Sequence, residues 1–259
     1  MKLMVNHQTH YRYTQNARNS VQSIKMMPQS SKHQIIENWH ISVPGEYRCQ
    51  RDAFNNLWLT ATQHHDYRYL TIMAQGIVDL FETEIGHFEN EISPYIFLQR
   101  TSLTHCDQEM LHSAQDIVRA KDRQHLILLS EKILEKMPYQ PESTSVTTLA
   151  TDAFYAAKGV CQDHAHVMIA MCKALHLPAR YVSGYLYDQN QPHLASHAWA
   201  EVFVDNQWYC FDVSNQIFSP QNHIYVAVGR DYLDVAPIRG VREQGGVESM
   251  MSVVQVLAC

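Results

Sequence analysis

One cysteine, Cys161, stands where a loop becomes a helix in the stretch GVCQDHAHVMIAMCKAL, residues 159–175. Apolar residues recur through this stretch and Pro178 follows it, so the sequence predicts a helix that packs inside the molecule and ends near Leu175. Unpaired backbone N–H groups and the positive end of the macrodipole favour a thiolate at a helix start. The stretch therefore predicts both a helix and a nucleophile at its start.

Three strand signals follow this helix, at residues 179–187, 196–204 and 207–214. Asp205 and Asn206 separate the last two, which is typical of a two-residue hairpin. Pairing the strands about this turn puts His197 opposite Ser214 and places Asp212 two residues along on the same face. A histidine and a carboxylate are thus expected side by side, downstream of the cysteine, as a nucleophilic triad requires.

The helices precede this sheet. Apolar spacings of three and four predict two amphipathic helices, one from Asp107 to about Val118 and one ended by Pro138, and a third is expected at residues 147–157. Further strands are expected at residues 223–232 and 252–257. Helices followed by an antiparallel sheet define an α+β fold.

The first third of the chain has a different pattern. Short alternating segments at residues 9–14, 38–43, 56–62 and 69–81, separated by turn-rich stretches, predict an antiparallel β domain with one buried face. We therefore expect an N-terminal β domain at residues 1–85, a connector at 86–106 and a catalytic core at 107–259. No part of the β domain resembles a catalytic or binding site.

Composition excludes several classes of protein. The net charge is −6 with neutral histidines, and no run of Lys or Arg forms a stripe, which argues against a nucleic-acid partner. No apolar run has spanning length and no secretion signal is visible, so we expect no membrane association and a cytoplasmic location. Six cysteines without a CxxC pair argue against a disulfide framework or a zinc ribbon.

Four segments together resemble the transglutaminase-like superfamily of the papain-like fold, in its bacterial branch with an N-terminal β domain. They are GVCQDHAH, PARYVSGYL (178–186), SHAWAEVF and GRDYLDVAPIRG (229–240). The resemblance implies that Cys161 is the nucleophile, His197 the base and Asp212 the orienting carboxylate. Relatives usually read Asp-Pro-Thr-Asn where this chain reads Asp-Val-Ser-Asn from residue 212, and the loss of proline is expected to free that turn.

Each of these residues also has a purely structural interpretation. Cys161 could be a small buried residue, His197 a hydrogen-bonded sheet histidine and Asp212 the cap of a turn. The joint occurrence of the motifs favours the catalytic interpretation. Trp199 lies on the same strand face as His197 and either lines a cleft or, as is more usual for a strand tryptophan, belongs to the core.

A cluster of zinc-ligand residue types around the cysteine suggests a metal site, but no usual ligand spacing is present. The cluster comprises Cys161, Asp163, His164, His166, His193 and His197. Asp163 and His164 are better explained as residues that cap or hold the helix start. We therefore expect neither a metal nor another cofactor.

The expected activity is acyl transfer by a cysteine nucleophile on an amide bond of a peptide or protein, through a thioester intermediate. Hydrolysis is favoured, and an amine-accepting transamidase that crosslinks proteins is the alternative. A catalytically silent peptide-binding module would not need the three residue types together. Arylamine-type acetyl transfer uses a similar triad, but no Gly-rich loop for the phosphates of coenzyme A is evident.

Overall fold

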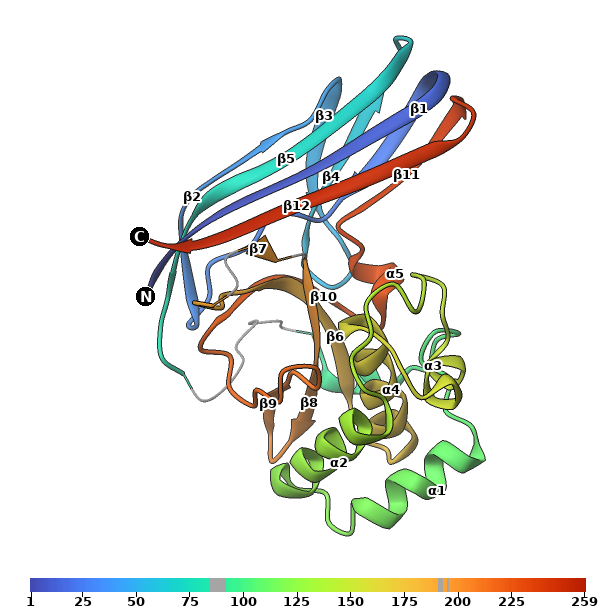
Figure 1. The fold of residues 1–259 in the computed structure, drawn as a ribbon. Coiled ribbons are helices and arrows are strands. Elements are labelled where there is room, and N and C mark those ends of the chain that lie inside the picture. The colour runs from blue at the N-terminus through green and yellow to red at the C-terminus, as the bar shows by residue number, and fades with distance from the viewer. Residues whose placement is uncertain (84–91, 191–192, 195) are drawn as a thin grey trace.

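The computed structural model describes residues 1–83, 92–190, 193–194 and 196–259. Positions 84–91, which hold the end of the expected β domain and the first part of the expected connector, lie outside the described residues, as does the side chain of His193. Two antiparallel sheets and a group of helices make up the described part (Figure 1). The α+β class expected from the sequence is confirmed.

An eight-stranded sheet forms the long curved arm of the molecule (Figure 1). Its central strand, β1, spans Lys2–Ile24, and side chains alternate between buried and exposed along its first half because one face packs on the core. The register of β1 shifts between Arg12 and Ala17, so its two halves have different neighbours. The other strands are β2 (Gln34–Ser42), β3 (Glu46–Arg51), β4 (Leu57–Gln63), β5 (Tyr67–Leu80), β7 (His193–Leu194), β11 (Ile238–Gln244) and β12 (Glu248–Ala258).

The end of the chain returns to this first sheet. Strand β12 pairs with β1 from Leu3 opposite Ala258 to Tyr13 opposite Glu248, and β11 pairs with the second half of β1. The two termini consequently lie together (Figure 1). The division of the chain at residues 85 and 106 stays a prediction, but these last strands extend the N-terminal sheet rather than the sheet of the expected core.

The second sheet has four strands in the order β10-β6-β8-β9. They are β6 (Ala179–Leu186), β8 (His197–Val204), β9 (Gln207–Phe211) and β10 (His223–Gly229). Every residue of β6 and β10 is buried, because helices cover one side of this sheet and the large sheet covers part of the other. Tyr185 of β6 and Ile224 of β10 pack there against Leu3, Val5 and Val78.

Helix α4 (Cys161–Ala174) occupies the centre of the helical group and packs on β6 and β8. Around it lie η1 (Pro94–Leu98), α1 (Gln108–Ile117), α2 (Arg123–Lys136), α3 (Ala150–Ala156) and the short α5 (Tyr232–Val235). Asp107 and Asp122 cap α1 and α2 by accepting hydrogen bonds from backbone N–H groups three residues on. Helices α1 and α4 begin close to their expected positions, and α2 ends at Lys136, before the expected stop at Pro138.

Helix α3 begins three residues later than expected. Thr148 accepts a hydrogen bond from the backbone N–H of Ser145, and its own N–H donates to the Ser145 carbonyl, so this segment forms a turn before the helix. Ser and Thr side chains compete with helical hydrogen bonds in this way. No helix in the described part of the chain has both the length and the apolar character needed to span a bilayer.

Candidate active site

The start of α4 is held by a carboxylate from its own first turn. Asp163 Oδ2 accepts hydrogen bonds from the Val160 backbone N–H at 2.8 Å and from Thr144 Oγ1 at 2.6 Å. A side chain at Gly159 would crowd this carboxylate, because an added Cβ would lie 2.7 Å from Asp163 Cβ. Asp163 therefore caps the start of α4, and Cys161 is the first helical residue.

Cys161 differs in exposure from the other five cysteines. Its side chain is partly exposed, whereas Cys106, Cys172 and Cys210 are buried. Cys49 and Cys259 are exposed, but they lie on β3 of the arm and at the C-terminus, away from α4. Cys161 is therefore the cysteine that combines solvent access with a helix start.

His164 joins α4 to two neighbouring segments, as its expected role in holding the helix start requires. Its Nδ1 lies 2.8 Å from Ser214 Oγ, and its Nε2 lies 2.7 Å from the Met137 carbonyl. Burial lowers the pKa of this imidazole, although the Met137 carbonyl partly opposes the shift. Ser214 thereby connects the turn after β9 to helix α4.

The β8–β9 hairpin has the predicted register. Asp205 and Asn206 have φ values of 51° and 60°, as a tight hairpin turn needs, and Val204 pairs with Gln207. The ladder ends at Phe211 rather than at residue 214, because Asp212 turns away to exchange backbone hydrogen bonds with Ile217. These bonds hold the Asp212 backbone although Val213, rather than a proline, follows it.

His197 and Asp212 meet as the hairpin predicts, with His197 Nε2 2.7 Å from Asp212 Oδ2. The Asp212 side chain is fully buried, while 11% of the His197 side chain is exposed. Burial by itself lowers the pKa of His197, but the charge of Asp212 and the hydrogen bond to it outweigh this and raise the pKa to about 10. The imidazole is therefore protonated at neutral pH.

Cys161 lies within hydrogen-bonding reach of this imidazole. After burial and Asp212, the causes that shift the pKa of His197 are a side-chain hydrogen bond and a charge interaction with Cys161. Burial raises the pKa of Asp212 and the two neighbouring imidazoles lower it, with a net shift well below the ordinary range. His197 thus interacts with both Cys161 and Asp212.

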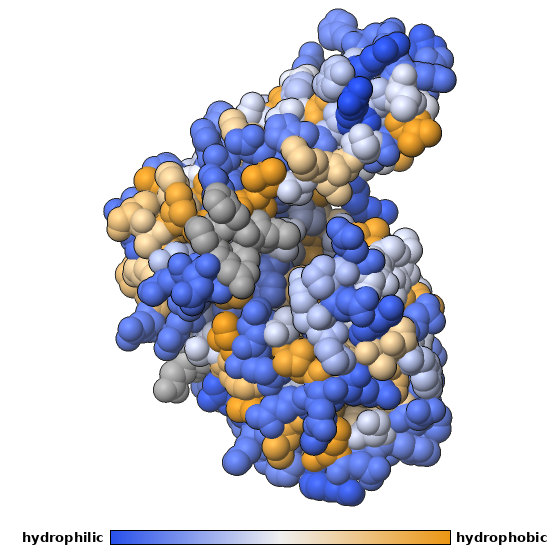
Figure 2. Space-filling model, viewed as in Figure 1, coloured by the Kyte–Doolittle hydropathy of each residue, from blue (hydrophilic) through white to orange (hydrophobic). Residues whose placement is uncertain are grey.

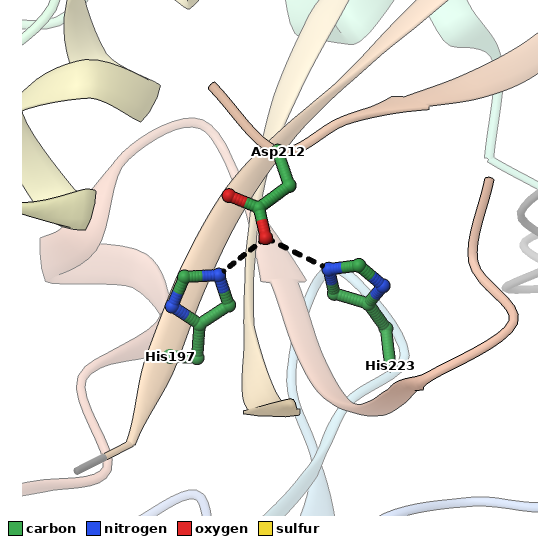
Figure 3. A group of neighbouring side chains, drawn as sticks. All are labelled: His197, Asp212 and His223. Atoms are coloured by element: carbon green, nitrogen blue, oxygen red, sulfur yellow. Dashed lines mark hydrogen bonds and ion pairs between the residues drawn. The ribbon is translucent and has the colours of Figure 1, made fainter. Parts of the chain in front are cut away.

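A second histidine, which sequence reasoning missed, contacts the same carboxylate oxygen. His223 Nε2 lies 3.1 Å from Asp212 Oδ2, on the side opposite His197 (Figure 3). His223 begins β10, and the only signal for it was its place at the start of an expected strand. Asn215 Nδ2 adds a third donor to this oxygen at 2.9 Å.

Trp199 belongs to the core behind the site and does not line an open cleft. Only 1% of its surface is exposed, and its ring stacks on His197 with the centroids 5.9 Å apart. It also packs against His223 and Tyr225, at 4.6 and 4.9 Å between ring centroids. The indole therefore limits the orientations that both imidazoles can adopt.

Three of the zinc-ligand types near Cys161 contact different partners in the described part of the chain. Asp163 caps the helix, His164 contacts Ser214 and Met137, and the buried His166 accepts a hydrogen bond from the Tyr232 backbone N–H. Among the residues that the structure describes, the one group with metal-like spacing is His197, Asp212 and His223, whose ligand atoms lie within 4.8 Å of one another. Because three N–H groups already point at Asp212 Oδ2, hydrogen bonding explains this group.

The larger hollows of the surface lie away from these residues. The molecule is indented beneath the arm (Figure 2). A cavity of about 420 Å³ lies between β4, β11 and α5, and its lining includes Trp58, Asp234 and Arg239. Cys161, His197 and Asp212 are therefore distinguished by their mutual contacts rather than by a large cavity.

Comparison with known proteins agrees with this architecture. The model of the transglutaminase-like superfamily matches residues 112–213, and that of the bacterial transglutaminase-like N-terminal region matches residues 3–79. The class is therefore that of the cysteine-based transglutaminase-like enzymes. The chain belongs to the transglutaminase-like superfamily, in the branch with the bacterial N-terminal region.

Individual relatives match nearly the whole chain. An uncharacterized protein of Mycobacterium leprae is 27% identical over 98% of this chain and 98% of its own length. An uncharacterized protein of Mycobacterium tuberculosis is also 27% identical, over 96% of this chain and 90% of its own. The solved structure of a candidate cysteine protease from Cytophaga hutchinsonii has a TM-score of 0.81 at 21% identity, covering 99% of this chain and 90% of that one. The papain-like fold expected from the sequence is thereby confirmed.

Proposed function

We propose that the protein is an acyl-transfer enzyme in which Cys161 is the nucleophile, His197 the acid and base, and Asp212 the orienting carboxylate. The observation that carries this proposal is the 2.7 Å contact between His197 and a buried Asp212, beside a partly exposed cysteine at a helix start. A carboxylate in this position fixes the tautomer of the imidazole and stabilises its positive charge. The arrangement pairs a protonated His197 with the Asp212 carboxylate at neutral pH.

The reaction proceeds in two steps. The Cys161 thiolate attacks the carbonyl carbon of an amide, and the His197 imidazolium donates its proton to the departing amine nitrogen as the C–N bond breaks. A thioester remains on Cys161. Water then attacks the thioester while neutral His197 takes up its proton, and the carboxylic acid product leaves with the thiolate restored.

The negative oxygen formed during attack needs hydrogen-bond donors. As the first residue of α4, Cys161 has a backbone N–H without an intrahelical partner. This N–H lies on the nucleophile itself and at the positive end of the helix, which suits an oxyanion donor. The proposed chemistry uses no metal and no cofactor.

We further propose that water is the preferred acceptor and that the substrate is a peptide or protein amide in the cytoplasm. The likeness in fold to the candidate cysteine protease of Cytophaga hutchinsonii is consistent with hydrolysis. Six free cysteines, three of them buried, suit a reducing compartment. Transamidation differs only in the acceptor, since an amine would replace water in the second step.

Product masses distinguish these outcomes. The purified protein is incubated with a pool of glutamine-containing peptides, with and without a primary amine, next to a Cys161→Ala control. We expect cleaved or deamidated peptides in both conditions and none with the control. Amine adducts as the main product would make the protein a transamidase, and equal products from the Cys161→Ala variant would overturn the triad.

A further inference from the structure

His223 shares the Asp212 oxygen with His197 but has a different environment. Its side chain is fully buried, and it reaches the carboxylate from β10, the edge strand of the four-stranded sheet (Figure 3). The proposed reaction does not use this histidine. A buried polar side chain aimed at a catalytic carboxylate calls for an explanation of its own.

The hydrogen bonding of His223 identifies its protonation state. Nε2 faces Asp212, and Nδ1 is buried without a partner among the described residues. A charged ring would leave a buried N–H unpaired, which is costly, so the neutral form with its proton on Nε2 is favoured. Burial lowers the pKa of His223 in spite of Asp212, in agreement with a neutral ring.

Side chains of the N-terminal region hold the strand that carries this histidine. His33 Nε2 donates to the His223 carbonyl at 2.8 Å. Gln34 both donates to the Tyr225 carbonyl and accepts from the Tyr225 N–H, at 2.8 Å each. Asn56 makes the same double contact with Val228, also at 2.8 Å each. The amide side chains of Gln34 and Asn56 thus form hydrogen bonds with the backbone of β10, along the edge of the four-stranded sheet.

We infer that His223, held by His33 and Gln34, is a positioning residue that keeps the Asp212 carboxylate aimed at His197. The N-terminal β region thereby contributes to the geometry of the site without touching the reacting atoms. A neutral donor suits this purpose because it satisfies a lone pair of the carboxylate without adding a second positive charge beside the imidazolium. The inference rests on the proposed function of the triad.

Few charged groups surround the two imidazoles. Asp212 and Cys161 face His197, and His223 itself lies beside it. Asp212 and His197 face His223, with Glu201 of β8 a weaker influence on its pKa. His164 of α4 and the buried Cys210 of β9 are further titratable groups near Asp212. A change at His223 therefore reaches His197 chiefly through Asp212.

The test measures the pKa of His197 by NMR of protein labelled with 15N-histidine, assigned with a His197→Gln variant. In His223→Leu the donor is lost, so Asp212 turns from His197, and the pKa of His197 falls by at least about one pH unit. His223→Gln, which retains an N–H near the position of Nε2, restores most of the wild-type value. The rate of Cys161 alkylation by iodoacetamide at about pH 6 falls roughly tenfold in His223→Leu and recovers in His223→Gln.

A matched control separates positioning from general destabilisation. His7→Leu removes another buried histidine, which contacts Tyr185 and Ser252 and not Asp212, and is expected to leave the pKa of His197 unchanged. An unchanged or higher pKa in His223→Leu would overturn the inference, because loss of a dipole alone strengthens the pull of Asp212 on His197. If that variant does not fold, a charged His223, or one protonated on Nδ1, in the wild type at about pH 7 overturns it equally. These spectra require no substrate, so a failure of the proposed acyl transfer stays distinguishable.

Discussion

His197 and His223 contact the same oxygen of Asp212, but the two sides of the carboxylate differ in solvent access and in what holds them. On one side 11% of the His197 side chain is exposed, and the ring lies beside Cys161 with its pKa raised to about 10, because Asp212 outweighs burial. On the other side His223 is sealed, with its pKa lowered by burial. The accessible side can change its charge during a reaction, whereas the sealed side keeps the geometry constant.

The largest expected effect comes from the accessible side. His197→Ala removes the group that donates and accepts the proton, so turnover of a peptide substrate should fall by about 10³-fold or more. The measurement is kcat/KM by product mass, with the exposed His112→Ala as control. Retention of activity within tenfold of the wild type would assign the proton transfer to another group.

Asp212→Asn tests the shared oxygen. The amide cannot stabilise an imidazolium, so the pKa of His197 should fall from about 10 towards its ordinary value near 6.5, and the rate above neutral pH should fall by about 10²-fold. The reaction requires protonated His197, so the rate declines as the pH rises through the pKa of this residue. In Asp212→Asn that decline, the basic limb of the pH–rate profile, should therefore occur at lower pH than in the wild type. A pH–rate profile records the limb, and an unmoved basic limb would contradict the pairing.

Acid should lower the free energy of unfolding through two buried histidines, one in the large sheet and one in the helical group. Burial lowers the pKa of His7 in the large sheet to about 4 and that of His166 in the helical group to about 3, against 6.5 in the unfolded chain. The unfolded state binds more protons, so stability is present above about pH 6.5 and is lost as the pH falls towards 4. The loss at His7 is on the order of 3 kcal/mol. The free energy of unfolding, measured with urea at a series of pH values, should depend less steeply on pH in His7→Gln than in the wild type. An identical dependence on pH in the two proteins would contradict the prediction.

The two amide contacts on β10 give the smallest effects and the closest comparison. Gln34→Leu and Asn56→Leu each leave a backbone pair of the buried strand without partners, which should cost about 1–3 kcal/mol of unfolding free energy. Gln34 is hydrogen-bonded to Tyr225, close to His223, whereas Asn56 is hydrogen-bonded to Val228, further along β10. Only Gln34→Leu should therefore also slow the alkylation of Cys161. Equal slowing by both variants would mean that the arm stabilises the whole sheet and not the site in particular.

The same contrast explains what the sequence could predict. The helix at Cys161, the helix that begins after Asp107 and the hairpin that joins His197 to Asp212 depend on neighbours close in the chain, and each lies near its expected position. Patterns of spacing and turn residues record such contacts directly. The accessible side of the site was therefore predictable residue by residue.

The sealed side depends on contacts between distant parts of the chain. His33 and His223, which share a hydrogen bond, are 190 positions apart in the chain, and Gln34 and Tyr225 are 191 positions apart. Strand β12 pairs with β1 across almost the full length of the chain. A strand pattern shows that residues 252–257 form a strand but carries no information about its partner. The sequence therefore did not predict that the last strands return to the first sheet. It did not predict the contact of His223 with Asp212 either.

The central claim is that Cys161 is an ionised nucleophile paired with His197, and selective alkylation tests it most directly. A Cys49→Ser, Cys259→Ser protein, which lacks the two exposed thiols outside the site, is treated with iodoacetamide at about pH 6 and digested for mass mapping. The account predicts one stoichiometric adduct, on Cys161, formed at least about tenfold more slowly when His197 is replaced by Gln. An adduct distributed over the other cysteines, or a Cys161 rate equal to that of the unfolded chain, would contradict it.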